Sequence, residues 1–530
     1  MSAPEPAPLR PSRYAVVGGT VFRHPAGHLV RPVLQTATAR VHLVDLGTAA
    51  RLDTAARLSL DPPPPPAEVD AGLTRPSSAE TGTGPAPTVE ASPGPMSPKT
   101  GDAGLGSVLP KTGDAGSSSM LPKTGDAGSG SVLPRTVDAA HEARLAQVGL
   151  LVDDARDEVA EVLDASRRAA DGRVRDFVVM PSAYCNMGCG YCGQRHERVT
   201  VARDHRSALA ERVERAAASG RYDRIGVRWF GGEPLLAFAV LRDLSQRFVA
   251  SADTAGIGYA AKLVTNGALL DARKLRALHR ECRVATIEIT LDGPAETHDA
   301  SRPLKNGQGS FRHITTVLAA ALADEELAGL RFVIRTNVGV ENAALAEPFA
   351  AELAGAGLAH DRVNCYPAPI HSWGNDVGAV ALSPAAAAEV ELEWFAAYQR
   401  HGLRFPLLPN RPRRVVCAAV TRHSEVVAPD GGIYSCTEQP LVPGHGDARV
   451  GHVSVLDPAA LRPAGAFDDW HDALAAGETG CRDCAILPLC GGACPKLWRE
   501  GMPPCPSLRT NVRQRLDLFA LAAGCTLVTG

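Results

Sequence analysis

RDFVVMPSAYCNMGCGYCGQ, residues 175–194, joins an apolar run typical of a buried strand to three closely spaced cysteines. The spacing of Cys185, Cys189 and Cys192 is C-x3-C-x2-C, and the motif directly follows the predicted strand. Three neighbouring thiolates can hold three irons of a cubane cluster and leave the fourth iron open to bind another group. A structural zinc site with His196 as the fourth ligand is the alternative for the same residues.

Strands and helices alternate on the C-terminal side of this motif. Such alternation indicates an α/β fold with a parallel sheet and helical crossovers. Six units favour a partial (β/α)6 TIM-like barrel, while the pattern alone also allows a doubly wound sheet. Either fold places chemistry at the carboxyl ends of the strands. The predicted strands are 175–181, 224–230, 260–265, 284–291, 330–338 and 362–368, with helices at 203–219, 235–250, 270–280, 311–324 and 343–355.

Thirteen cysteines are many for a chain whose thiols are expected to stay reduced, so we expect most of them to bind metal. Besides the three above, seven form a C-terminal group with short, regular spacings at its end. Taken alone, the spacing of Cys481, Cys484, Cys490 and Cys494 would also fit a paired-zinc site. Among the other three cysteines, which include Cys525, we expect Cys282 and Cys365 to be buried. The C-terminal group is Cys417, Cys436, Cys481, Cys484, Cys490, Cys494 and Cys505.

The first motif resembles that of the radical S-adenosylmethionine (SAM) enzymes, in which Tyr191 matches an aromatic residue before the third cysteine. The next strand ends in WFGGEP (229–234), similar to a family turn whose backbone and glutamate meet the methionine amino group. Later strand ends carry TNG (265–267), LDGP (291–294) and RTN (335–337). The resemblance implies that SAM is bound by Tyr191, Gly231, Gly232, Glu233, Pro234, Asn266, Asp292, Arg302, Arg335 and Asn337.

The seven C-terminal cysteines resemble those of the SPASM domain, a module of many radical SAM enzymes that holds auxiliary [4Fe–4S] clusters. The resemblance implies that Cys417, Cys436 and Cys494 share one cluster. It assigns the other cluster to Cys481, Cys484, Cys490 and Cys505. Two cubanes have eight irons, so one iron lacks a thiolate. Some family members supply an eighth cysteine where this chain has PNRPRR (409–414). We therefore expect an open iron or a non-cysteine ligand in the first auxiliary cluster.

The resemblance covers about residues 175–510 and implies an oxidoreductase with three [4Fe–4S] clusters and S-adenosyl-L-methionine as cofactors. Reductive cleavage of SAM yields a 5′-deoxyadenosyl radical in this family. That radical is expected to abstract hydrogen from a peptide or protein side chain, giving an oxidative modification or a crosslink. An electron donor such as a flavodoxin or ferredoxin is the expected partner. Dehydrogenation of a small-molecule alcohol or sugar is an alternative, and so is a non-catalytic iron–sulfur electron carrier.

Residues 1–60 have a β-rich pattern and form the predicted start of a small N-terminal α+β subdomain. Within them, VRPVLQTATARVHLVDL (30–46) is typical of a hairpin, and a short helix is expected near 52–60. Such a hairpin can bind a leader peptide by adding a strand to its edge. A structural lid is the equally plausible alternative.

The rest of the chain divides into five segments. Residues 61–138 are low in complexity and repeat LPKTGDAG with a period of 12, so we expect disorder. Residues 139–172 are predicted to be helical and to complete the N-terminal subdomain. The predicted radical SAM core spans 173–370, a connector with one helix spans 371–410, and the SPASM domain spans 411–530.

Composition argues against other classes of protein. The 530 residues are 45% hydrophobic and carry a net charge of −3, so we expect neither nucleic-acid binding nor a polybasic membrane anchor. No apolar run reaches the about 18 residues of a transmembrane helix, and no secretory signal is recognised at the start. We therefore expect a cytoplasmic protein.

Overall fold

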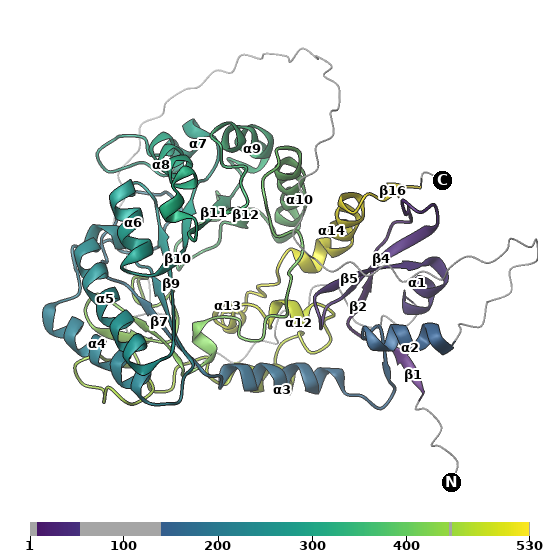
Figure 1. Cartoon of the computed structure of the whole chain (residues 1–530), viewed down its shortest axis with the longest axis horizontal. Coiled ribbons are helices and arrows are strands. Elements are labelled where there is room, and N and C mark those ends of the chain that lie inside the picture. The colour runs from purple at the N-terminus through teal and green to yellow at the C-terminus, as the bar shows by residue number, and fades with distance from the viewer. Residues whose placement is uncertain (1–7, 54–138, 445–447, 529–530) are drawn as a thin grey trace, which may run out of the picture.

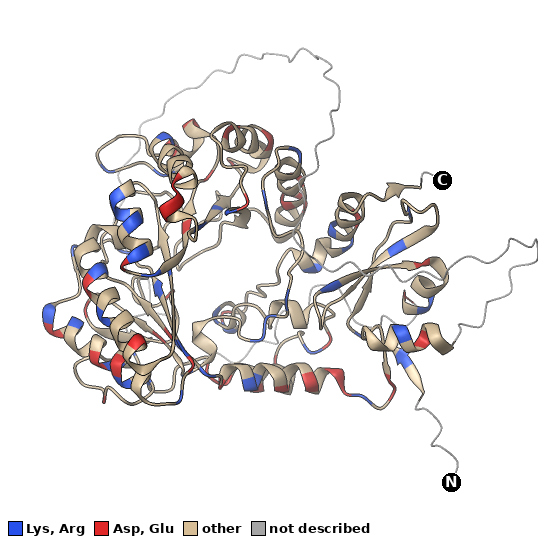
Figure 2. Cartoon of the chain, in the orientation of Figure 1, with Lys and Arg blue, Asp and Glu red and all other residues tan. Residues whose placement is uncertain are grey.

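The structure is a computed structural model that describes residues 8–53, 139–444 and 448–528. The predicted repeats at 61–138 lie outside the described residues. Figure 1 shows a large α/β body and a smaller N-terminal one, with helix α3 (Glu158–Ala170) running from one to the other. Acidic and basic residues are interspersed along this helix (Figure 2).

A nine-stranded mixed sheet forms the centre of the larger body. Its order is β12-β11-β10-β9-β8-β7-β13-β14-β15, and strands β7 to β12 are parallel and adjacent in chain order. The bounds of β7 to β12 are Val174–Val179, Arg224–Trp229, Gly258–Thr265, Val284–Thr290, Arg331–Val338 and Val363–Pro369. The six predicted strands are thus confirmed. Because their order contains no reversal, the doubly wound alternative is excluded.

Helices connect the parallel strands where the sequence pattern predicts them. Their bounds are α4 (Arg203–Ala218), η1 (Pro234–Ala237), α5 (Phe238–Ala255), α6 (Ala272–Arg280), α7 (Ala295–Ser301), α8 (Phe311–Ala323), η2 (Glu325–Leu327), η3 (Ala343–Leu345), α9 (Ala346–Gly355) and α10 (Pro384–Arg400). In α6, Leu275 and Leu278 are three residues apart and both enter the main core. They meet strand side chains such as Ile287 and Ile289, which are fully buried. Helix α10 is the one predicted within the connector.

The N-terminal body contains a five-stranded antiparallel sheet in the order β16-β3-β4-β2, with β5 on the other side of β4. Its strands are β2 (Ala15–Val17), β3 (Phe22–Arg23), β4 (Leu29–Gln35), β5 (Arg40–Asp45) and β16 (Thr526–Leu527). The hairpin predicted at 30–46 is confirmed. Helix α1 (Leu46–Asp53) begins after Asp45, which accepts a hydrogen bond from Thr48 N at 2.9 Å and caps the helix. Residues 54–60 of the helix predicted near 52–60 lie outside the described residues.

The prediction of a helical segment at 139–172 is wrong in its middle. Helices α2 (Ala139–Gln147) and α3 flank strand β6 (Leu151–Asp153), which pairs with β1 (Leu9–Pro11). Gly149 follows α2 with a φ of +76°, a conformation that ends a helix at little cost only for glycine. Leu150 and Leu151 are then buried in the N-terminal core.

Strands from residues 411–530 extend the central sheet. Strand β13 (Ser424–Val427) pairs in parallel with β7, and β14 (Gly432–Tyr434) and β15 (Gly451–His452) follow antiparallel. Helices of this region are η4 (Ala418–Val420), α11 (Trp470–Ala476), α12 (Leu487–Cys490), α13 (Pro495–Arg499) and α14 (Leu508–Ala522). None of the described helices is long and apolar enough to cross a bilayer.

Candidate functional site

The loop after β7 carries the first three cysteines side by side. Burial raises the pKa of Cys185 to about 11, and the charge of neighbouring Cys189 acts in the same direction. Burial also raises the pKa of Cys189, which the charge of Cys192 raises further. Cys192 Sγ lies 3.8 Å from His196 Nε2. Because thiolates are the metal ligands, a bound cluster has to displace protons from this group.

The turn after β8 packs tightly against the cysteine loop. A Cβ on Gly231 would lie 2.7 Å from Ser182 O, and one on Gly232 would lie 2.6 Å from Tyr184 O. Only glycine therefore allows this approach. Pro234 occupies the first turn of η1, where its lack of an N–H costs nothing.

The Glu233 carboxylate joins the ends of β8 and β9 next to the cysteines. It is fully buried and accepts hydrogen bonds from Thr265 Oγ1 and Asn266 N, both at 2.8 Å. Burial raises the pKa of Glu233, and these hydrogen bonds oppose the rise. Asn266 Nδ2 donates to Asn186 Oδ1 at 2.8 Å and lies 3.7 Å from Cys185 Sγ. The β9 end is thereby held against the first cysteine.

A second polar network flanks the cysteine loop on the side of β10 and β11. Asp292 accepts from the Tyr191 hydroxyl and from Asn337 N at 2.7 Å. Asn337 in turn donates from Nδ2 to Tyr191 Oη at 2.8 Å, and Arg335 Nε donates to Asn337 Oδ1 at 2.9 Å. Arg302 Nη1 donates to Tyr191 Oη and lies 3.4 Å from Asp292 Oδ2.

Arg302 has a buried donor without a partner in this network. Its Nε is buried and has no hydrogen-bond partner among the described residues. The charge of Arg302 also opposes the burial that raises the pKa of Cys189, so the guanidinium lies near that thiol. An unused buried donor beside cysteines fits an additional polar group at this position.

Three further side chains support the site, of which sequence reasoning missed Asn342 and Lys305 and named His298 only as a polar residue after the fourth strand. Asn342 Nδ2 donates to the carbonyl oxygens of Asp292 and Asn337 at 2.7 and 2.9 Å. Lys305 Nζ donates to Cys185 O at 2.9 Å. His298 Nδ1 accepts from Asp292 N at 3.1 Å. The sequence signal for all three is weak, because each is a single polar residue in a helix or loop after a strand.

Four C-terminal cysteines line one cavity. Cys481, Cys484, Cys490 and Cys505 surround a space of about 280 Å³, counting its opening to solvent. Burial raises the pKa of Cys481 and of Cys490 to about 12. The Arg509 guanidinium also lines this cavity and donates from Nη1 to Cys505 Sγ at 3.4 Å. The same four cysteines are those that the family resemblance assigns to one auxiliary cluster.

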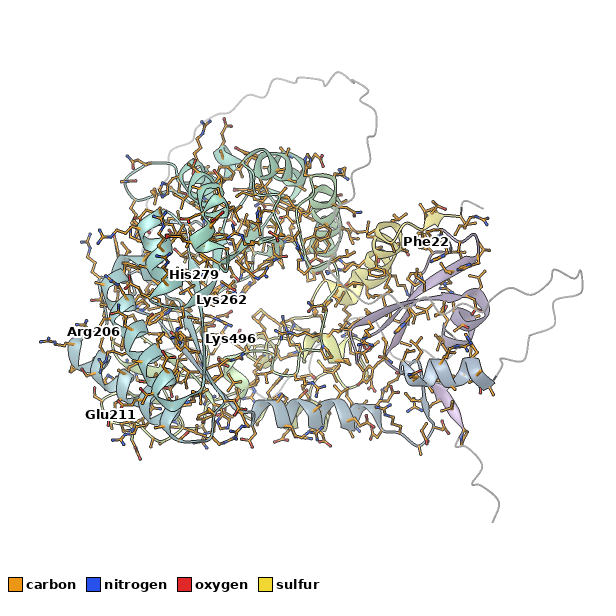
Figure 3. The ribbon with its side chains drawn as sticks, in the orientation of Figure 1. Phe22, Arg206, Glu211, Lys262, His279 and Lys496 are labelled. Atoms are coloured by element: carbon orange, nitrogen blue, oxygen red, sulfur yellow. The ribbon has the colours of Figure 1, made fainter. Side chains whose placement is uncertain are left out.

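The other three C-terminal cysteines form a separate group. Burial raises the pKa of Cys436 to about 12, and the charges of Cys417 and Cys494 add to the effect. The Glu438 carboxylate is an electrostatic neighbour of all three thiols. Lys496, labelled in Figure 3, places its Nζ 3.7 Å from Glu438 Oε2.

The described side chains do not form a site for a single metal ion. Within the described ranges, no three His, Cys, Asp or Glu side chains are placed to hold one metal ion. A tetrahedral zinc ion, with Zn–S bonds of about 2.3 Å, draws its sulfur ligands to within about 4 Å of one another. A cubane instead binds each cysteine through a different iron. Cys494 lies outside the cavity group, so the four cysteines of the paired-zinc alternative are not brought together.

Residues 179–324, which contain the cysteine loop and the ends of β8, β9 and β10 beside it, match the family model of the radical SAM superfamily. This segment is a radical SAM domain. The cofactors of such domains are a [4Fe–4S] cluster and S-adenosylmethionine. The residues present fit them, because three thiols remain available for iron and two polar networks with an unused Arg302 donor lie beside them.

Comparison with single proteins gives more distant similarities. An uncharacterized protein of Synechocystis sp., sll1766, is 29% identical over 150 residues, which are 25% of this chain and 34% of that protein. The chain thus spans about a third of the length of that curated relative. Native anSMEcpe with bound AdoMet is 17% identical, with a TM-score of 0.49 over 66% of this chain and 97% of that one. SuiB of Streptococcus suis bound to precursor peptide SuiA is 14% identical, with a TM-score of 0.41 over 69% and 85%.

Proposed function

We propose that the chain is a radical SAM enzyme with a SPASM-type module holding two auxiliary [4Fe–4S] clusters, and that it modifies a peptide or protein oxidatively. The observation that carries this proposal is the set of three thiols on the β7 loop, flanked by polar side chains from the ends of β8 to β11. We further infer that the six parallel strands form a partial (β/α)6 barrel, since they are adjacent in chain order and the sheet is not closed.

The chain's own residues hold and orient the cofactors in this proposal. Cys185, Cys189 and Cys192 bind three irons of the first cluster. Glu233 and Asn266 fix the loops next to Cys185, where the family turn meets the methionine amino group. When bound, the cluster and SAM supply one-electron cleavage of the sulfonium and a 5′-deoxyadenosyl radical. Burial of the surrounding side chains excludes water, which protects such chemistry from side reactions.

The peptide substrate is proposed from the N-terminal sheet. Among the described residues, β5 pairs only with β4, so its second edge is open. Val41, Leu43 and Val44 of this strand are buried, so the edge presents little apolar side-chain surface. An extended peptide is the ligand that such an edge binds, by adding a strand. Leader recognition at β5 is therefore part of the proposal.

We also propose a flavodoxin or ferredoxin as electron donor and the cytoplasm as the site of action. All thirteen cysteines are free, as cluster ligation requires, and the cytoplasm keeps thiols reduced.

Cleavage of SAM is the first test of this function. Anaerobically reconstituted protein with dithionite is expected to release 5′-deoxyadenosine, measured by mass spectrometry. The variant with Cys185, Cys189 and Cys192 replaced by Ala should release none and still retain iron in its C-terminal clusters. Cys282→Ala, which removes a buried core thiol outside all three groups, is the control and should remain active. Release of 5′-deoxyadenosine by the triple variant would place the SAM site elsewhere.

A further inference from the structure

The two C-terminal cysteine groups differ in the number of thiols that they offer. Four thiols surround the cavity of Cys481, whereas Cys417, Cys436 and Cys494 form a group of three. A cubane has four irons, so the second group needs one more ligand or leaves one iron open. We propose that the carboxylate of Glu438 is the fourth ligand of the cluster bound by Cys417, Cys436 and Cys494. This inference rests on the proposed function, which places a cluster at that group.

The backbone holds Glu438 at the three thiols. Its N–H points at Cys436 Sγ at 3.5 Å, and Gln439 N donates to Cys436 O at 3.3 Å. These contacts fold a tight turn directly after Cys436. The turn keeps the Glu438 side chain close to the sulfur atoms, in agreement with its electrostatic effect on Cys417 and Cys494.

One oxygen of the Glu438 carboxylate lacks a hydrogen-bond partner among the described residues. Oε2 is buried and accepts no hydrogen bond from any described residue, while Oε1 lies 3.4 Å from His371 Nε2. Lys496 Nζ is 3.7 Å from Oε2, which exceeds hydrogen-bond distance, and it donates instead to Glu500 at 3.0 Å. Burial acts to raise the pKa of Glu438, but His371 and Lys496 hold it below its usual value, so the carboxylate is charged. The ion pair with Lys496 leaves Oε2 without a hydrogen bond, and an iron ion beside it would use that free oxygen.

The chemistry of a carboxylate suits this position. An aspartate or glutamate oxygen binds iron as an anion with the same single negative charge as a thiolate, so no electron transfer is needed to form the bond. Lys496 is only 5% exposed and lies two residues after Cys494, where its positive charge offsets the added negative charge. An oxygen ligand also binds iron less firmly than sulfur, which makes this iron the most labile of the four.

Mössbauer spectroscopy of the auxiliary clusters tests the assignment. The full-length Cys185→Ala, Cys189→Ala, Cys192→Ala variant confines ⁵⁷Fe to the C-terminal clusters. We expect about one iron in eight to show the larger isomer shift of an oxygen ligand, given two four-iron clusters. Adding Glu438→Gln or Glu438→Ala should remove this component. Glu500→Gln removes the other carboxylate at Lys496 and is the matched control, in which the component should persist.

A second readout follows the labile iron directly. After gel filtration without free iron, the Glu438→Ala protein is expected to lose one ferrous iron from this cluster, while the Glu500→Gln protein, in the same triple-cysteine variant, keeps about eight irons. Ferricyanide then takes one electron from the remaining three-iron cluster and gives the electron paramagnetic resonance signal of its oxidised form. If eight irons load and both Glu438 variants match the parent in both measurements, the ligand assignment is wrong and the proposed function stands. If the C-terminal region of the parent binds zinc or only four irons, the auxiliary clusters of the proposed function fail, and the ligand assignment fails with them.

Discussion

His298 is a fully buried histidine with both ring nitrogens engaged. Nδ1 accepts from Asp292 N, and Nε2 lies 3.0 Å from Ser310 Oγ, so the neutral ring with a proton on Nε2 satisfies both contacts. Burial and then the charge of Arg302 lower its pKa from 6.5 to about 3. The unfolded chain therefore takes up a proton between these pH values that the folded chain excludes.

Because the folded chain keeps His298 unprotonated, its free energy of unfolding should fall in acid. As pH falls from 6.5 towards 3, His298 should remove up to about 1.4 kcal/mol of folding free energy per pH unit. His298→Gln cannot titrate, so we expect it to be less stable at pH 7 but to lose less on acidification. Urea unfolding of both proteins at pH 7, 6 and 5 measures this difference. Parallel curves for the two proteins would contradict the role given to His298.

Arg509 is expected to set the reduction potential of one auxiliary cluster. Its positive charge opposes the burial that raises the pKa of Cys484, and it donates to Cys505 Sγ. Hydrogen bonds and positive charge at cluster sulfurs favour the reduced state. Arg509→Gln should therefore lower the potential of this cluster, and Arg509→Lys should lower it less. The potentials are measured by a redox titration that is followed by electron paramagnetic resonance. Equal potentials in the parent protein and in both Arg509 variants would exclude this effect.

At the scale of elements, the open edge of β5 has a defined backbone register. The carbonyl oxygen of Pro32 accepts from Gly18 N at 2.8 Å on the β2 side of β4. Backbone groups alternate along a strand, so Leu34 also faces β2, and Val41, which lies opposite Leu34, faces away from β4. His42 is the next residue and faces β4.

A pair of proline variants uses this register. Val41→Pro removes an N–H from the open edge and should weaken binding of the precursor peptide encoded beside the gene about fivefold, from the ~1 kcal/mol of one hydrogen bond. His42→Pro removes an N–H that faces β4 and should lower the melting temperature of the N-terminal body. Calorimetric titration and thermal unfolding provide the two measurements. Unchanged peptide affinity in Val41→Pro would exclude strand addition at this edge.

At the scale of the whole molecule, one buried carboxylate joins the C-terminal region to the core. Glu425 of β13 is fully buried and accepts from Arg175 Nη2 at 2.8 Å and from Arg212 Nε at 3.0 Å. Burial acts to raise the pKa of Glu425, but the two arginines keep it below the usual value. Arg212 also donates to the carbonyl oxygen of Asp457, which extends the contact into the C-terminal region.

Removing this carboxylate should lower the free energy of unfolding of the chain. Glu425→Gln leaves two buried arginines without their counter-charge, for which we expect a loss of about 3–5 kcal/mol in the free energy of unfolding. Glu161→Gln, in an exposed pair with Arg156, should cost less than about 1 kcal/mol. Denaturant unfolding of the two variants provides the comparison. Similar losses in both would mean that Glu425 does not hold the two regions together.

The parts of this protein that could be predicted from sequence are those governed by local spacing. The alternation of apolar strands and helices predicted the six parallel strands, and the cysteine spacings separated a group of three thiols from a group of seven. The division of the seven into two sets came from the family resemblance, and the four of one set line one cavity. The supporting residues could not be predicted, because their roles depend on distant partners. Asn342 bonds to Asp292 across fifty residues, and Glu425 meets Arg175 across 250. A single polar residue gives no periodic signal for such contacts.

The pairing of β16 with β3 constrains the order of events during synthesis. Residues 526–527 complete a sheet whose other strands lie between residues 15 and 45, so this strand reaches the sheet only after about 480 further residues have been made. Pairing across such a separation is slow, because a very long loop must close first. Until then, the β3 edge is a template for strands of other nascent chains. Production of this protein should therefore benefit from slow translation and low temperature.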